Sequence, residues 1–406
     1  MAAALLLALA MLLANCALTG RPASPSAAEV SAAPSSPPAP APAPTPPPVT
    51  PCPHGSWQGG VCADCGERCT HDWQGGVCVI CGERCAHERH DPDTRLCLVC
   101  GEKLTHLLKE GSCTRCGWVP PFRDESLPEE CFAECPEPGT IETIDFRDAE
   151  EPTAGKPPKS KKALVYLPYG YDPEGERRYD LVIALHGAGS DEHGMMDEPH
   201  AAVGDGIGFY RIYDWMICEG LCEPFILVSV NVYSLTEEDS VTDYGVGKLA
   251  ERFPSLVLPY IVEHYGTFAA DSSPEAMRAA REHVGLIGLS NGSLYALSAG
   301  MAKNLEYFGG YACFSGNYPE NAGAVIERLN APDAGDWPVY CFLAGAGTKD
   351  FQQNNTELRF ELLADECGGL ERGANAFHVD VEGTHNWHSW GVEVYNALLV
   401  LFQNRS

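Results

Sequence analysis

One short stretch, Val284 to Leu294, has the residue types and spacing for nucleophilic chemistry. It reads V-G-L-I-G-L-S-N-G-S-L, so an apolar run leads directly into Gly-x-Ser-x-Gly with Ser290 at its centre, and a helix-compatible segment follows. A strand, this motif and a helix, in that order, predict a nucleophile elbow, a strained turn that exposes the serine hydroxyl above a sheet. Gly288 and Gly292 would let neighbouring backbone pass close to Ser290. The alternative is a Gly/Ser loop without chemistry.

Two later segments offer an acid and a base for Ser290. Asp350 follows the apolar run VYCFLAG, and His385 follows FHVDVEG. His385 would serve as general base and then general acid, while Asp350 would accept the imidazole Nδ1–H and fix its tautomer. The order Ser290, Asp350, His385 is that of an α/β-hydrolase. His388 is a competing base, and Asp350 could instead be a solvated loop residue or a helix N-cap.

A loop of small residues, H-G-A-G-S, starts at His186 after the run DLVIAL. Such a loop beside an elbow can aim backbone N–H groups at a developing oxyanion, and we expect those of Ala188 and Asn291 to do so. The alternative is a simple strand-ending turn. Trp387 and Trp390 are three residues apart and share a helical face. They either pack the loop of His385 or line a substrate pocket together with His186.

The elements that must position these residues follow a regular pattern. Apolar runs of strand length recur at 163–168, 180–186, 225–231, 284–290, 311–316, 339–345 and 377–383, and an amphipathic helical pattern covers 253–265. Strands that alternate with helices predict a mostly parallel sheet with helices on both faces. Polar residues at the carboxyl ends of such strands then meet at one edge. We therefore expect one α/β domain over 163–406.

The same residues carry a family resemblance. The blocks YLPYGYDPEGERRYDLVIALHGAGSDE, FPSLVLPYIVEHYG, IGLSNGS, GTKD and EGTHNWHSW resemble, in order and spacing, those of bacterial feruloyl esterases and the wider esterase D-like group. In that group G-x-H-x-W-x-x-W holds the triad histidine, which matches Gly383, His385, Trp387 and Trp390. The resemblance covers about Ala163 to Asn404. It implies serine hydrolysis of carboxylic esters, often feruloyl or acetyl groups on plant polysaccharide, with no cofactor for catalysis.

A Cys/His repeat precedes this domain, at 52–118. Thirteen of the nineteen cysteines lie between Cys52 and Cys135, and WQGGVC occurs twice. Each complete copy has three thiols and one imidazole, the ligand set of a closed structural zinc site, so we expect zinc-ribbon-like repeats that hold zinc. The expected ligands, copy by copy, are Cys52, His54, Cys62 and Cys65, then Cys69, His71, Cys78 and Cys81, then Cys85, His87, Cys97 and Cys100, and finally His106, Cys113 and Cys116.

The alternative for this repeat is a disulfide scaffold, which is common in exported proteins. The recurring histidine and the odd number of cysteines in the region favour zinc. The fourth copy has Leu104 where the others have their first cysteine, and Cys131 or Cys135 could complete it. Cys218 and Cys222 could form a local disulfide or stay separate.

The remaining segments suggest export and spacing. Residues 2–14 are almost all Ala and Leu, as in a signal peptide, so 1–20 is expected to be a secretion or lipoprotein signal with Cys16 as a lipid-anchor candidate. Residues 21–51 are a Pro/Ala-rich linker, and 119–162 are expected to be a second linker. The net charge of −29 argues against a nucleic-acid partner.

Together these features predict a secreted or surface-anchored serine carboxylesterase that acts on plant or cell-wall polysaccharide. The zinc-ribbon-like repeats would have a partner that the sequence does not identify. Two alternatives remain: a surface binding or scaffold protein with a hydrolase-like domain, and an acyltransferase or peptidase of the same fold.

Overall fold

The computed structural model describes residues 57–58, 61–62, 69, 71–74, 77–80, 84–88, 91, 95–149, 159–196, 208–237, 243–316 and 322–405. The expected signal segment at 1–20 with Cys16 and the expected linker at 21–51 lie outside these residues, as do Cys52, His54, Cys65 and Cys81. No helix in the described part of the chain is long and apolar enough to cross a membrane.

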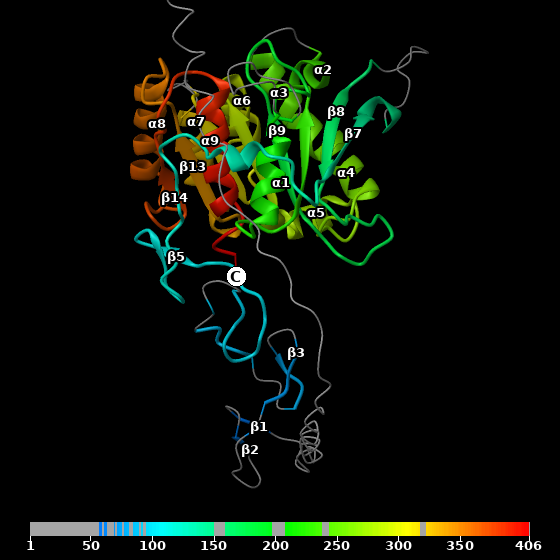
Figure 1. Cartoon of the computed structure of the whole chain (residues 1–406), viewed down its shortest axis with the longest axis vertical. Helices are drawn as coiled ribbons and strands as arrows, with labels where there is room; N and C mark the ends of the chain where they lie inside the picture. The colour runs from blue at the N-terminus through cyan, green and yellow to red at the C-terminus, as the bar shows by residue number, and fades with distance from the viewer. Residues whose placement is uncertain are drawn as a thin grey trace, which may run out of the picture. The chain divides into compact units, whose positions relative to one another are not determined.

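An eight-stranded sheet organises the structure (Figure 1). Its strand order is β14-β13-β12-β11-β9-β10-β8-β7, and the six strands from β14 to β10 run parallel, whereas β8 and β7 pair antiparallel. Most of the strands are buried on both faces, which explains their continuous apolar sequences. The strands are β7 (Thr140–Asp145), β8 (Lys162–Leu167), β9 (Asp180–Leu185), β10 (Phe225–Val230), β11 (Val284–Leu289), β12 (Gly310–Phe314), β13 (Cys341–Gly345) and β14 (Ala376–His378).

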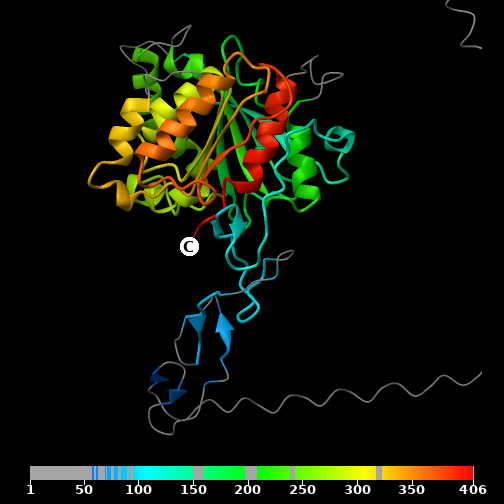
Figure 2. The ribbon, with the colours of Figure 1, turned by 90° about the vertical axis from the view of Figure 1, so that its left-hand side faces the viewer.

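Helices cover both faces of this sheet, as Figure 2 shows with the sheet nearly edge-on. One buried cluster joins α1 (Tyr210–Cys218) and α9 (Trp387–Val400) to one face. A second cluster covers the other face. The remaining helices are α2 (Val232–Thr236), α3 (Asp243–Arg252), α4 (Leu258–His264), α5 (Pro274–Ala279), α6 (Asn291–Tyr295), α7 (Ala322–Leu329) and α8 (Gln353–Glu366).

The short helical turns complete the domain. The amphipathic pattern at 253–265 forms a π-helical turn that leads into α4, and Pro259 lacks the N–H that a regular α-helix would use there. The π-helical turns are η3 (Phe253–Val257) and η5 (Ala296–Met301), and the 3₁₀ turns are η1 (Glu129–Phe132), η2 (Phe146–Ala149), η4 (Arg281–His283) and η7 (Ala334–Asp336).

The segment expected as a linker at 119–162 belongs in part to the sheet. β7 pairs along its whole length with β8 and forms one edge. Cys135, just before β7, forms a disulfide with Cys218 at the end of α1, so neither the fourth Cys/His copy nor Cys222 uses these thiols. The side chains of β7 are largely polar and partly exposed, as is usual for an edge strand. The strand was therefore not recognised from the sequence.

The Cys/His repeat recurs as a small antiparallel hairpin. Pairs of two-residue strands form in the first, second and fourth copies, with the same register in each. In the third copy an isolated bridge joins Leu96 and Lys103. The hairpin strands are β1 (Trp57–Gln58), β2 (Val61–Cys62), β3 (Trp73–Gln74), β4 (Val77–Cys78), β5 (Leu108–Lys109) and β6 (Ser112–Cys113).

Candidate functional site

Ser290 lies at a sharp turn between β11 and α6. Its backbone has φ 53° and ψ −116°, a conformation that non-glycine residues rarely adopt. A Cβ on Gly288 would overlap the Gly292 carbonyl, and a Cβ on Gly292 would overlap the Leu185 carbonyl. Both positions therefore need glycine, and the strained turn places the Ser290 hydroxyl beyond the end of β11.

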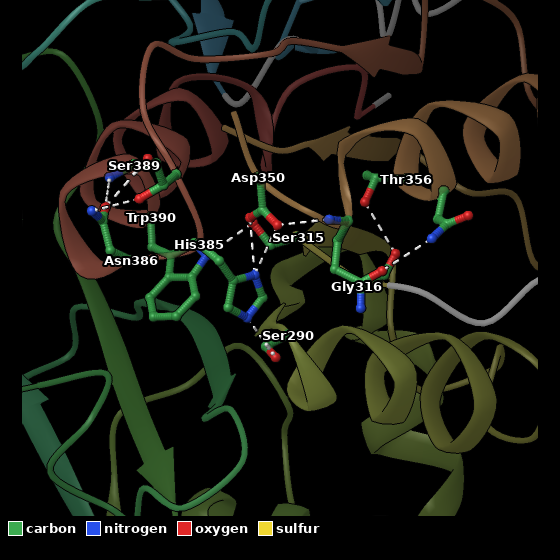
Figure 3. Close-up of polar contacts among 12 residues, drawn as sticks. Ser290, Ser315, Gly316, Asp350, Thr356, His385, Asn386, Ser389 and Trp390 are labelled. Carbon is green, nitrogen blue, oxygen red and sulfur yellow. Dashed lines mark hydrogen bonds and ion pairs between the residues drawn. The ribbon is translucent and has the colours of Figure 1, made fainter. Parts of the chain in front are cut away.

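The structure brings Ser290, His385 and Asp350 together (Figure 3). The His385 Nε2 lies 3.1 Å from the Ser290 Oγ, and its Nδ1 lies 2.9 and 3.0 Å from the two Asp350 carboxylate oxygens. A carboxylate accepts hydrogen bonds, so Nδ1 carries the hydrogen and Nε2 is left to accept the serine hydroxyl. This arrangement can transfer the Ser290 proton to His385 and produce an activated nucleophile.

The Asp350 side chain is fully buried. Burial tends to raise the pKa of Asp350, but hydrogen bonds from His385, the Gln352 N–H and Ser315 outweigh it and lower that pKa below its ordinary value. The Gln352 N–H lies 2.8 Å from one carboxylate oxygen. Asp350 therefore stays ionised at neutral pH and can stabilise a protonated His385.

Two loops must approach closely for Asp350 and His385 to meet. A Cβ on Gly347 would lie 2.7 Å from the Gly383 carbonyl carbon. Only glycine at position 347 therefore lets the loop that carries Asp350 come this close to the loop that carries His385. Backbone hydrogen bonds of 2.8 Å then join Thr348 to Val381 and Lys349 to Gly383. These contacts fix the spacing between the acid and the base.

The small-residue loop after β9 lies against the nucleophile. A Cβ on Gly187 would be 3.2 Å from the Ser290 Cβ, and the next residue, Ala188, is exposed. Asn291, the first residue of α6, directly follows Ser290. The backbone of Ala188 and that of Asn291 thus lie on the two elements that border Ser290.

The predicted pocket residues His186 and Trp387 and the alternative base His388 lie in different surroundings. His186 is buried, its Nδ1 lies 2.7 Å from the Gly187 carbonyl oxygen, and its Nε2 accepts the Val232 N–H at 3.1 Å. Both of its ring nitrogens therefore bond to backbone. Trp387 packs on Phe209 with ring centroids 5.6 Å apart. His388 lies in the first turn of α9, and its Nε2 is 2.9 Å from the Ser126 hydroxyl, away from Ser290.

Trp390, expected either to pack the loop of His385 or to line a pocket, is buried, and its ring contacts the His385 ring with centroids 4.9 Å apart. Three further residues near the triad, Ser315, Phe351 and Glu393, were not expected from the sequence. Ser315 follows β12, accepts the Trp390 indole N–H and hydrogen-bonds Asp350. The exposed Phe351 ring lies 4.4 Å from the His385 ring. Glu393, on α9, is fully buried. Of these three residues, only Ser315 has a marked position in the sequence, near the end of the apolar run YACFSG and one run before Asp350, but this position does not reveal its role.

The Cys/His repeats form compact clusters wherever the structure describes them. In the third copy, ligand atoms of all four expected residues lie within 4.8 Å of one another. The second and fourth copies each bring together three, and Cys81 of the second lies outside the described residues. These clustered residues are Cys85, His87, Cys97 and Cys100, then Cys69, His71 and Cys78, then His106, Cys113 and Cys116.

The spacings in these clusters suit a tetrahedral metal. The sulfur atoms are 3.7 Å apart for Cys69 and Cys78, and 3.6 Å apart for Cys85 and Cys97. Sulfur-to-imidazole separations are 3.7 and 3.5 Å in the third and fourth copies. Zinc–ligand bonds of about 2.3 Å to sulfur and about 2.0 Å to nitrogen give tetrahedral edges of about 3.8 and 3.6 Å. The clusters could therefore hold zinc.

Comparison with known proteins agrees with this fold. No family model matches the chain. The chain is 25% identical over 256 residues to endo-1,4-beta-xylanase Y of Acetivibrio thermocellus and spans only 22% of that protein's length. Its structure matches the feruloyl esterase module from Clostridium thermocellum, an S954A mutant complexed with sinapinate, with a TM-score of 0.58 and 22% identity over 71% of this chain and 96% of the other.

A ferulic acid esterase from Anaeromyces mucronatus, solved with ferulic acid, matches with a TM-score of 0.51 and 19% identity, over 69% of this chain and 97% of the other. This chain has the α/β-hydrolase fold. The sequence resemblance to feruloyl esterases is thus matched by structural neighbours, and the mostly parallel sheet predicted from the apolar runs is confirmed.

Proposed function

We propose that the chain is a serine carboxylesterase in which Ser290 is the nucleophile. The observation that carries this is the position of His385, hydrogen-bonded to Ser290 on one side and to Asp350 on the other. In the first step, His385 Nε2 takes the hydroxyl proton while Ser290 Oγ attacks the ester carbonyl carbon. The N–H groups of Ala188 and Asn291 would stabilise the oxyanion that forms.

The second half of the reaction reverses these roles. The tetrahedral intermediate collapses, the alcohol leaves with the proton from His385, and the acyl group stays on Ser290. Water then attacks the acyl-enzyme, gives its proton to His385 and releases the acid, and Ser290 regains its hydrogen. Asp350 holds the imidazole in the correct tautomer and stabilises its charged form throughout.

For the substrate, we infer feruloyl or acetyl esters of plant polysaccharide. Support comes from the similar proteins, a feruloyl esterase module complexed with sinapinate and a xylanase, and from the blocks of sequence shared with feruloyl esterases. Export from the cytoplasm fits the Ala/Leu-rich residues 2–14 and the Cys135–Cys218 disulfide, because disulfides persist in oxidising compartments.

The test is hydrolysis of methyl ferulate, 4-nitrophenyl acetate and acetylated xylan by the full chain, with Ser290→Ala as control. We expect turnover of ferulate that falls at least about 10⁴-fold in the variant. Turnover of the acetyl esters alone would support the proposed mechanism but would show that the substrate is an acetyl ester and not a feruloyl ester. A folded protein that turns over none of the esters would favour a binding protein instead.

We also infer that the Cys/His repeats hold structural zinc, because their ligand type and spacing suit it. Zinc measured per chain should fall by about one in Cys97→Ser. If titration of the denatured, unreduced protein found these cysteines in disulfides, the zinc assignment would be wrong.

A further inference from the structure

Ser315 follows β12, which neighbours the strand that leads to Asp350, and it is fully buried. Its φ of 50° lies in the left-handed region, and its N–H donates to the Gly345 carbonyl at 2.8 Å. A serine keeps this conformation only where the surrounding contacts fix it. The backbone thus holds the Ser315 hydroxyl near Asp350, at the carboxyl ends of the parallel strands (Figure 3).

The hydrogen bonds of this hydroxyl have only one consistent direction. The Trp390 indole N–H donates to the Ser315 Oγ at 2.9 Å, and an indole nitrogen can only donate. The Ser315 oxygen is therefore the acceptor in that bond. Its single hydrogen remains for Asp350, whose side chain is hydrogen-bonded to Ser315.

The same indole also contacts the base. The Trp390 and His385 ring centroids are 4.9 Å apart, and the ring planes are 84° apart, an edge-to-face contact. Trp390 is buried in the first turns of α9, so its ring has little freedom. One side chain therefore restrains the imidazole directly and the carboxylate through Ser315.

We propose that Ser315 and Trp390 are positioning residues that hold Asp350 and His385 in register for the reaction. This inference rests on the function proposed above. Neither residue meets the ester in this scheme: Ser315 acts through Asp350, and Trp390 acts through Ser315 and His385. Their effect should therefore fall on the rate of the chemical steps and leave substrate binding unchanged.

The kinetic test compares Ser315→Ala, Trp390→Phe and the double variant with the wild type. Each single change should lower kcat about 10- to 100-fold, with KM unchanged within about 2-fold. Ser315→Ala removes a hydrogen bond to a charged carboxylate, and Trp390→Phe removes the N–H that orients the same hydroxyl. Trp390→Phe keeps an aromatic ring and removes only the N–H donor. The double variant should be no slower than the slower single one, because both changes break one chain of contacts. Additive losses would overturn the proposal.

Ser229→Ala is the matched control, because Ser229 is a buried serine on β10 of the same sheet. Its kcat should equal that of the wild type. An equal loss in Ser229→Ala would mean that any buried serine matters, and the proposal would fail.

A second readout needs no substrate. The proton between His385 Nδ1 and Asp350 should give a low-field NMR resonance, assigned by its loss in Asp350→Asn. We expect this resonance to shift in Ser315→Ala and Trp390→Phe and to stay in place in Ser229→Ala. An unchanged resonance in both variants would overturn the proposal whatever the kinetics. A shifted resonance in a protein whose wild type hydrolyses no ester would reject the proposed function and keep the positioning role.

Discussion

At the scale of single residues, the site depends on how a buried carboxylate is kept charged. Asp350 is ionised because several donors surround it, and His385 gains its orientation from the same group. Glu393, on the helix that follows His385, lacks such donors. Both of its oxygens are buried with no hydrogen-bond partner among the described residues, and burial, together with the charges of Asp350 and Asp380, raises its pKa well above the ordinary value.

This difference predicts a pH dependence of stability. Below about pH 4.5 Glu393 is protonated in both the folded and the unfolded chain, so it adds no pH dependence to the stability. Above that pH the unfolded chain loses the proton while the folded protein keeps it, so the free energy of unfolding falls by about 1.4 kcal/mol per pH unit until the raised folded-state pKa is reached. Glu393→Gln cannot titrate and removes this contribution.

The measurement is urea unfolding of the wild type and Glu393→Gln at several pH values between 5 and 8. The variant should gain stability relative to the wild type as the pH rises. Identical pH slopes for the two proteins would show that Glu393 titrates normally in the folded state.

At the scale of elements, tight passages between strands and loops decide where the site residues lie. The α6 helix starts directly after Ser290, and its Gly292 passes against the Leu185 carbonyl at the end of β9. A side chain at this position must push β9 and α6 apart, and the H-G-A-G loop that follows β9 would move with them.

Gly292→Ala should therefore lower kcat/KM strongly and destabilise the fold by about 1–3 kcal/mol, the usual cost of overpacking. Gly323→Ala is the matched control, because Gly323 lies in α7 with open space around it. That change should stabilise the fold by about 0.5–1 kcal/mol and leave activity unaltered. Equal effects of the two substitutions would contradict the close approach at Gly292.

Much of the arrangement of strands and helices could be predicted from the sequence. Continuous apolar runs fix the central strands, because strands buried on both faces contain few polar residues. The residues that follow those runs then meet at one sheet edge, which is why Ser290, Asp350 and His385 could be named together. The strand β7 could not be predicted in this way, because an edge strand with polar side chains has no continuous apolar run. The role of Ser315 could not be predicted either, because it depends on a contact with Trp390, which is 75 residues away in the sequence.

At the scale of the whole molecule, the fourth Cys/His copy is joined to the hydrolase fold. The His106 N–H donates to the Gln403 side chain at 2.8 Å, and the His106 carbonyl accepts the Asn404 N–H at 2.8 Å. Leu108 and Cys113 belong to the same buried cluster as α1 and α9. A metal held by this copy would therefore stabilise the end of the hydrolase chain.

Cys116→Ser should accordingly lower the melting temperature of the hydrolase domain, by about 2–4 °C for each kcal/mol lost. Cys100→Ser is the matched comparison, since Cys100 is the equivalent half-buried cysteine of the third copy, which contacts the hydrolase fold through ion pairs of Arg95 and Lys103 with the partly exposed Glu223. It should shift the main transition less than Cys116→Ser does, because exposed ion pairs contribute little to stability. The measurement is calorimetry of both variants and the wild type, with and without a chelator. Equal shifts of the melting temperature in the two variants would contradict the special role of the fourth copy.

The central claim is that Ser290 is the activated nucleophile, and one measurement tests it most directly. The full chain would be treated with a fluorophosphonate, which reacts covalently with activated serine hydroxyls, and the labelled peptide would be identified by mass spectrometry. We predict a single label on Ser290, absent in Ser290→Ala and formed far more slowly in His385→Ala. Labelling of another residue, or no labelling of the folded protein, would contradict the account.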